Sequence, residues 1–185
     1  GPESTLEYYR SITYKCQKLS NNGSFPNIAI ESVNLYEMLE LCKRKDYFKL
    51  KDFILLAVEN VSRAGAEFGA IASNTPHIIF EELKKSSPIP LISIVNETYK
   101  KVKDSNIDKV GLIGTKFTMG EDFYKKIFRE NGIRISVPDE SEQEYIDNKI
   151  FTELEYGIVR DETKKSFLHI IEDMRERHGI NGVIL

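Results

Sequence analysis

A stretch of five residues in the first half of the chain holds four polar side chains close together. Ser73-Asn74-Thr75-Pro76-His77 follows directly on the apolar run 68–72. This places a hydroxyl, an amide and a second hydroxyl at the carboxyl end of a predicted buried strand, the edge at which α/β proteins hold their ligands. The pattern therefore indicates a site for a small polar molecule.

A second pair of hydroxyls follows a predicted strand in the other half of the chain. The apolar run 110–113 ends at Gly114, and Thr115 and Thr118 come soon after it. The start of a helix offers free backbone N–H groups to an anion, and nearby hydroxyls add to them. Thr115 and Thr118 are therefore the candidates for carboxylate binding in this half.

The spacing of apolar residues predicts an alternation of strands and helices along the whole chain. Such an alternation is typical of an α/β fold with a parallel, doubly wound architecture. The predicted helices span 3–19, 35–42, 47–64, 78–85, 97–104, 121–130, 141–154 and 161–177, and the predicted strands span 27–33, a run that ends at Ala72, 90–94, 109–113, 134–137 and 182–185.

A break near residues 92–96 separates two sets of alternating strands and helices, each with its own apolar runs. We therefore expect two similar doubly wound lobes, 1–93 with the Ser73-Asn74-Thr75 turn and 94–185 with the Gly114-Thr115 turn. Facing lobes would bring both turns to one cleft, a common location for a ligand. The predicted active site lies in that cleft.

The composition is that of an ordinary folded protein: of 185 residues, 41% are hydrophobic and 30% charged, with a net charge of -3. Basic residues are interleaved with acidic ones instead of clustering on one segment, which speaks against a nucleic-acid-binding face. No apolar segment approaches the roughly 20 residues of a membrane span. Cys16 and Cys42 are too few and too isolated for a disulfide framework or a zinc site, which favours a reducing cytoplasm. Nucleotide-binding signatures and His-rich metal spacings do not occur, so we expect no metal and no cofactor.

Several motifs occur in a specific order: Gly1-Pro2-Glu3-Ser4-Thr5 with Tyr8-Tyr9-Arg10, Ala64-Gly65-Ala66, Ser73-Asn74-Thr75-Pro76-His77, 110–115 with Phe117-Thr118-Met119, Glu153-Leu154 with Gly157, and 182–185. Together they resemble the aspartate/glutamate racemase family of cofactor-independent amino-acid racemases. The resemblance covers essentially the whole chain. It implies an amino-acid substrate, aspartate or glutamate, and a homodimer.

In that family two thiols flank the α-carbon of the substrate, one as thiolate base and the other as thiol acid. The chain departs from this pattern twice. Ser73 stands where the first cysteine is usual, and the sequence ends at Leu185, where family members typically continue with a glycine and the second cysteine. The family's first strand would likewise precede Gly1, so we expect a longer polypeptide of which both ends are trimmed.

Ser73 is the catalytic candidate, with three explanations for its identity. An alcohol without assistance is seldom charged near pH 7 and is a poor base. The protein is a natural racemase with one thiol, an engineered Cys-to-Ser variant, or a protein that has lost the reaction. A structural role for Ser73, capping the helix predicted to begin near Ile78, is a further alternative.

The resemblance assigns binding of the substrate carboxylate and ammonium to Asn74 and Thr75, although both residue types also suit a tight turn. Thr115 would contribute to carboxylate binding from the second half. His77 could orient the turn through a ring hydrogen bond or serve as a packing residue.

An acidic substrate also needs a cation for its side-chain carboxylate. Lys43, beside Arg44, matches the position of a family arginine, but lysine lacks the bidentate fork of arginine. A second basic residue commonly follows the Glu-Leu-x-x-Gly motif, where this chain has Ile158 and the nearest basic residue is Arg160. Both departures weaken the prediction of an acidic substrate.

Two functions of different class therefore remain. The first is racemisation of an amino acid without pyridoxal phosphate. The second is a degenerate racemase that binds an amino acid or related carboxylate without turning it over. A serine hydrolase is disfavoured, because no Gly-x-Ser-x-Gly motif surrounds Ser73.

Overall fold

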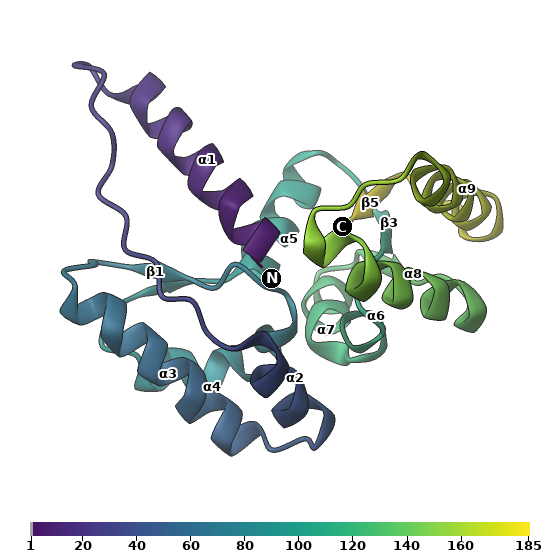
Figure 1. The fold of residues 1–185 in the computed structure, drawn as a ribbon. Coiled ribbons are helices and arrows are strands. Elements are labelled where there is room, and N and C mark those ends of the chain that lie inside the picture. Colours follow the sequence, from purple (N-terminus) through teal and green to yellow (C-terminus); the bar gives the residue numbers. More distant parts are fainter. Residues whose placement is uncertain (1) are drawn as a thin grey trace. The chain divides into compact units, whose positions relative to one another are not determined.

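The computed structural model describes residues 2–185, so that Gly1 of the first motif lies outside the described part (Figure 1). The chain divides into two compact units, Gly1–Ile94 and Val95–Leu185. In chain order the elements are α1 (Pro2–Leu19), α2 (Leu35–Lys43), α3 (Tyr47–Arg63), β1 (Gly69–Ala70), the 3-10 helix η1 (Thr75–Ile79), α4 (Phe80–Ser86), β2 (Leu91–Ile92), α5 (Ile94–Asp104), β3 (Lys109–Leu112), α6 (Lys116–Gly120), α7 (Asp122–Glu130), β4 (Arg134–Ser136), α8 (Glu140–Thr152), η2 (Leu154–Tyr156), α9 (Asp161–His178) and β5 (Gly182–Ile184).

The core of the first unit forms where α2, α3, η1 and α4 pack together, and α3 and α4 lie side by side (Figure 1). Asp46 caps α3 by accepting a hydrogen bond from the backbone N–H of Lys49 at 3.2 Å. From there the apolar residues of α3 recur every four positions and bury one face of the helix. The buried apolar side chains of these elements are Met38, Cys42, Leu50, Ile54, Val58, Ile79, Phe80 and Leu83.

The strand predicted over 27–33 is wrong, because this segment runs through the structure without strand or helix. A strand needs a neighbour that accepts and donates its backbone hydrogen bonds. In its place, a side-chain contact holds the segment, since Asn60 Nδ2 of α3 donates to Glu31 Oε1 at 2.8 Å. The alternating side chains Ile28 and Ile30, which suggested a strand, are consequently exposed.

The second unit contains a parallel sheet in the order β4-β3-β5. Val110 and Leu112 of the central strand face a cluster that includes Tyr124 and Phe128 of α7. On the other face of the strand, a Cβ at Gly111 would lie 2.8 Å from Ile180 Cδ1 and 3.0 Å from Met174 Cε of α9. Glycine therefore lets α9 approach the sheet closely, and helices cover both faces of it.

The predicted α/β class with parallel strands is confirmed in both units, since β1 and β2 also pair in parallel. Several boundaries differ. The first strand stops at Ala70 instead of Ala72, and the helix predicted over 78–85 divides into η1 and α4. The short helix α6 follows Thr115 as a separate element, and the helix predicted over 141–154 ends at Thr152 before η2.

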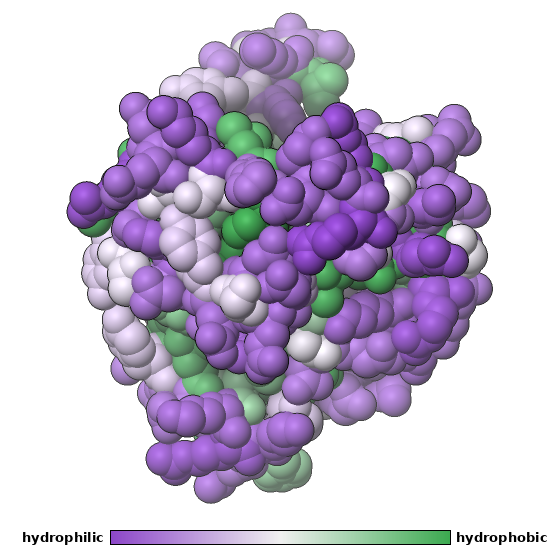
Figure 2. Space-filling model, turned by 90° about the vertical axis from the view of Figure 1, so that its right-hand side faces the viewer, coloured by the Kyte–Doolittle hydropathy of each residue, from purple (hydrophilic) through white to green (hydrophobic). Residues whose placement is uncertain are grey.

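The face drawn in Figure 2 carries mostly hydrophilic residues, with hydrophobic ones in small separate patches. Charged side chains commonly pair with an opposite charge three or four residues away, as Lys100 does with Glu97 at 2.6 Å. Within residues 2–185, no helix combines the length and the apolar character needed to cross a membrane.

Candidate active site

The turn after β1 lies at the carboxyl edge of the two-stranded parallel sheet. Gly69 and Ala70 of β1 pair with Leu91 and Ile92 of β2, so both strands end on the same side. Ser73 is half-buried in the turn, three residues beyond the end of β1. Open α/β sheets bind their ligands at this edge.

The 3-10 helix η1 starts at Thr75, directly after Ser73 and Asn74. Asn74 is its N-cap residue. The backbone carbonyl of Asn74 accepts a hydrogen bond from the N–H of His77 at 2.9 Å, but the Asn74 side chain makes no capping bond. Thr75 is buried, with 4% of its surface exposed. Ser73 caps neither η1 nor α4, so the alternative of a capping serine is not what the structure contains.

His77 makes a hydrogen bond with each ring nitrogen. Nδ1 lies 2.9 Å from the carbonyl oxygen of Ser73, and the backbone N–H of Ile94 donates to Nε2 at 3.1 Å. The ring also stacks on Phe80, with 5.1 Å between centroids. Burial lowers the pKa of His77 to about 4, against the hydrogen bonds to Ser73 and Asn74 that raise it.

The state of His77 decides what chemistry Ser73 can perform. The imidazole is neutral near pH 7 and both its nitrogens are occupied by backbone groups, so it offers no lone pair to the Ser73 hydroxyl. A serine hydroxyl that receives no help from a base stays protonated at neutral pH, and His77 provides none. Ser73 is therefore suited to donating a proton to a carbanion and ill suited to removing one from a neutral substrate.

Thr115 acts as the N-cap of α6. Its Oγ1 accepts a hydrogen bond from the Thr118 N–H at 3.2 Å and donates to Thr118 Oγ1 at 3.1 Å. The backbone N–H of Lys116 donates to the Asp147 carboxylate at 2.6 Å. Two of the first N–H groups of α6 thus already have partners, which weakens the prediction that this helix start binds an external carboxylate.

Lys43 and Arg44 lie at the end of α2, which packs against η1. Both side chains are exposed and make ion pairs with Glu40 of their own helix, at 4.0 Å for Lys43 and 3.6 Å for Arg44. Pairs of this kind are weak in water. Either cation is therefore available to an anionic ligand at little cost.

Glu153 is the centre of a polar cluster that the motifs did not predict, and its side chain is only 8% exposed. The carboxylate accepts hydrogen bonds from Lys149 Nζ and Thr163 Oγ1, each at 2.6 Å, and Arg160 Nε lies 3.6 Å away. These contacts lower the pKa of Glu153, the bond from Lys149 most of all.

Arg160, the basic residue nearest to the expected anchor position, is thus held by Glu153, and Ile158 is exposed. The spacing of Lys149 and Glu153 by four residues was the sequence signal for this cluster.

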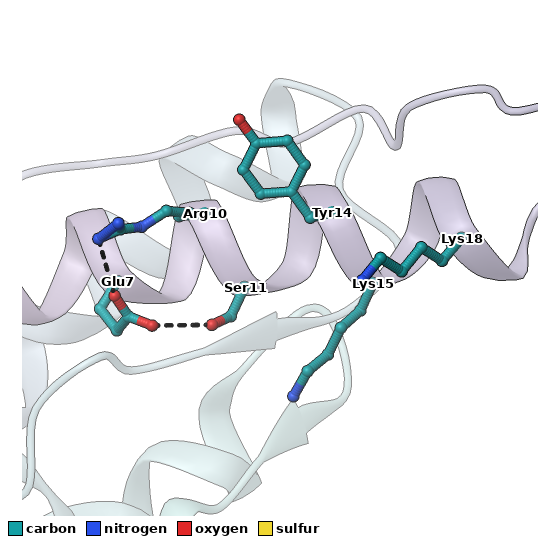
Figure 3. Close-up of a pocket in the computed structure, with 6 residues that line it drawn as sticks. All are labelled: Glu7, Arg10, Ser11, Tyr14, Lys15 and Lys18. Carbon is teal, nitrogen blue, oxygen red and sulfur yellow. Dashed lines mark hydrogen bonds and ion pairs between the residues drawn. The ribbon is translucent and has the colours of Figure 1, made fainter.

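Two surface hollows are lined by residues other than those of the Ser73 turn. One, of about 390 Å³, is lined by six residues of a single helix, α1 (Figure 3). There Glu7 accepts a hydrogen bond from Ser11 at 3.0 Å and pairs with Arg10 at 3.4 Å. The other lies at the start of α9, and its lining includes Arg160 and Lys165. Among residues 2–185, no three His, Cys, Asp or Glu side chains are placed to hold a metal ion.

Comparison of the sequence and of the fold with known proteins points to the family that the motifs resemble. The Asp/Glu/hydantoin racemase family model matches residues 1–185. The broad specificity amino-acid racemase RacX of Bacillus subtilis (strain 168) is 27% identical over 146 residues, 77% of this chain and 63% of RacX, so the chain spans less than two thirds of that relative.

Solved structures extend the similarity to the fold. An aspartate racemase homologue from Pyrococcus horikoshii OT3 is 34% identical with a TM-score of 0.82, over 100% of this chain and 80% of that one. The Picrophilus torridus aspartate racemase has a TM-score of 0.76 over 100% of this chain and 76% of its own, at 19% identity, and thus shares the fold.

Proposed function

Because the chain belongs to the Asp/Glu/hydantoin racemase family, as its motifs predict, we propose that it interconverts the L and D enantiomers of an amino acid by moving a proton at the α-carbon without a cofactor. The observation that carries the proposal is the match of the family model along the whole chain. The position of the Ser73 turn at the carboxyl edge of the β1–β2 sheet supports it further.

In this proposal Ser73 is the catalytic residue on one face of the α-carbon. In one direction a second group on the opposite face removes the α-proton and the Ser73 hydroxyl gives its own proton to the carbanion, which leaves an alkoxide. In the reverse direction this alkoxide removes the α-proton and the second group, now protonated, returns one. Asn74 and Thr75 bind the carboxylate and ammonium of the substrate, and Thr115 contributes to carboxylate binding.

The proposed substrate is an acidic amino acid, aspartate or glutamate. Lys43 supplies the cation for the side-chain carboxylate, an assignment that its exposure and its weak pairing with Glu40 support. A single lysine selects an acidic side chain less sharply than an arginine fork. We therefore expect a preference for acidic substrates with measurable turnover of neutral ones.

Deuterium exchange tests the proposed reaction. The full-length protein is incubated in deuterated water with L-aspartate, L-glutamate and a panel of neutral amino acids, and α-deuterium uptake and enantiomer composition are followed by NMR and chiral chromatography. We expect both uptake and the D enantiomer, with hydroxylamine, a trap for pyridoxal phosphate, leaving the rate unchanged. No exchange with any amino acid would refute the proposal.

Ser73→Ala and Ser73→Cys test the role of the hydroxyl. Alanine should lower the exchange rate about a hundredfold, the contribution typical of a positioned acid or base. Cysteine should raise the rate above that of the wild type, because a thiol with an unperturbed pKa near 8.5 supplies both acid and base near neutrality. Ser136→Cys, which adds a thiol at the half-buried end of β4, is the matched control and should leave the rate unchanged.

Both ring nitrogens of His77 have backbone partners, so His77 cannot act as a base for Ser73. This favours a second candidate function, a protein that binds an amino acid or related carboxylate without racemising it. Calorimetry that detects binding, combined with no exchange even in Ser73→Cys, would support this function. Restored exchange in Ser73→Cys would exclude it.

The racemase proposal also includes a homodimer and a cytoplasmic location, which rest on the family resemblance and on the cysteine content. Analytical ultracentrifugation of the full-length protein tests the dimer, and a monomer at micromolar concentration contradicts it. Cell fractionation tests the location.

A further inference from the structure

We propose that His77 is a positioning residue, a neutral imidazole fixed in the Nδ1–H tautomer that ties the carbonyl of Ser73 to the amide of Ile94 and thereby sets the direction of the Ser73 side chain. The importance of this for turnover rests on the proposed racemase function. The tautomer and the positioning are testable without it.

Two independent contacts define the tautomer. The Ile94 backbone N–H can only donate, so Nε2, 3.1 Å away, must carry the lone pair. The Ser73 carbonyl can only accept, so Nδ1, 2.9 Å away, must carry the hydrogen. Both contacts require the same tautomer of the ring. The tautomer with hydrogen on Nε2 would place two donors against each other at Ile94 and two acceptors against each other at Ser73.

The imidazole ring links the two chain segments just beyond the point where β1 and β2 stop pairing. β1 and β2 pair through two residues each, Gly69 with Leu91 and Ala70 with Ile92. Beyond them the strands no longer pair, and the imidazole connects Ser73, three residues after β1, to Ile94, two residues after β2. A rigid ring therefore holds the backbone of Ser73 where the sheet itself does not.

The surroundings keep the ring neutral and in place. His77 is 4% exposed and stacks on Phe80 with 4° between the ring planes. The helices that pack against η1 bury apolar residues, such as Met38 on α2 and Leu50 on α3. The titratable group on their buried faces is Cys42, and burial raises the pKa of its thiol to about 11. A charge on His77 would have no anionic partner on these buried faces.

The first test observes the ring directly. A long-range ¹H–¹⁵N correlation spectrum of the wild-type protein should show His77 with hydrogen on Nδ1 and a bare Nε2, unchanged between pH 8 and pH 5. Hydrogen on Nε2, or protonation near pH 6.5, would overturn the proposal.

The second test measures positioning in a Ser73→Cys background, where the alkylation rate of the introduced thiol is followed by mass spectrometry. His77→Phe keeps a stacked ring but removes both hydrogen bonds, and should change this rate at least severalfold. Phe80→Leu removes the stacking partner but keeps both hydrogen bonds, and should leave the rate within about twofold of the parent. Equal effects of the two substitutions would show that packing alone acts on the turn.

The third test uses turnover of the full-length protein. His77→Phe should lower kcat about ten- to a hundredfold with little change in KM, since displacement of a reacting group affects the chemical step most. His77→Gln, whose amide also offers one donor and one acceptor, should recover part of the loss. Unchanged kcat in His77→Phe contradicts the proposal. An inactive wild type with the expected tautomer and alkylation rates would instead contradict the racemase function alone.

Discussion

The two cysteines of the chain lie in different surroundings, and their reactivity should differ accordingly. Cys42 is buried on α2, and desolvation raises the pKa of its thiol to about 11. At pH 8 only about one Cys42 thiol in a thousand is then ionised. Cys16 on α1 is half-buried.

We therefore expect a small thiol reagent to label Cys16 at pH 8 at least tenfold faster than Cys42. Residue-resolved mass spectrometry of a native time course measures both rates. Labelling under denaturing conditions is the control and should reach both residues. Faster native labelling of Cys42 would contradict the burial described for α2.

The buried carboxylate of Glu153 predicts a pH-dependent effect on stability. Its pKa is lowered by Lys149, Thr163 and Arg160, so its contribution is present above its unfolded value near 4.5 and is lost as the pH falls through the folded value. Glu153→Gln should lower the melting temperature at pH 7, and this difference should shrink below pH 4.

Glu97→Gln is the matched control, because the pair of Glu97 with Lys100 is exposed on α5. Its effect should stay within about 0.5 kcal/mol at either pH. Equal losses of melting temperature in the two variants at pH 7 would show that the Glu153 cluster adds no more than a surface pair.

At the scale of elements, Thr115 combines two roles that substitution can separate. It is the N-cap of α6 in the structure and a substrate-binding residue in our proposal. Thr115→Ala should cost about 1 kcal/mol of unfolding free energy through the lost cap. Thr115→Asp should keep the cap, since aspartate is a good N-cap residue, but should repel a substrate carboxylate.

Urea unfolding and substrate affinity, measured on both variants, check this separation. The expected pattern is lower stability in Thr115→Ala and weaker binding with near wild-type stability in Thr115→Asp. Unchanged affinity in Thr115→Asp would limit Thr115 to its capping role.

The sequence predicts most helices well because their signals are local. The apolar spacing of α3 and the acidic capping residue of α8, Asp139, are encoded within a few residues. The strand expected over 27–33 failed for the opposite reason, since alternation of Ile28 and Ile30 describes a surface without guaranteeing a partner. Pairing in β1 covers two residues, too short for apolar periodicity to locate.

The candidate site shows the same limit. The polar residues of the Ser73 turn are visible in the sequence as a break after an apolar run. The contact between His77 and Ile94 joins residues 17 positions apart through a backbone amide, and no side-chain type at Ile94 announces it. The cluster around Glu153 likewise needs Thr163 from another helix.

For the molecule as a whole, His77 predicts a loss of stability in mild acid. Its pKa is about 4 in the folded protein, against an ordinary value of 6.5 for a histidine in water. Between these values the unfolded chain binds a proton that the folded protein does not, so the unfolding free energy falls as the pH falls. The loss attributable to His77 should reach about 2 kcal/mol between pH 7 and pH 5.

Urea unfolding at pH 7 and pH 5 measures this loss. His77→Phe should reduce the difference between the two pH values by about that amount, while Phe80→Leu, which retains the imidazole, should keep it. Identical pH dependence in the wild type and His77→Phe would contradict the assigned state of the ring.

The hydrogen bond from the Ile94 amide to an imidazole nitrogen makes that amide an internal probe. Most backbone N–H groups in folded proteins donate to carbonyl oxygens, whereas this one senses the magnetic environment of an aromatic heterocycle. Its proton resonance should therefore lie apart from those of the other amides of α5. Following that one signal during a ligand titration reports on the Ser73 turn without any label attached to it.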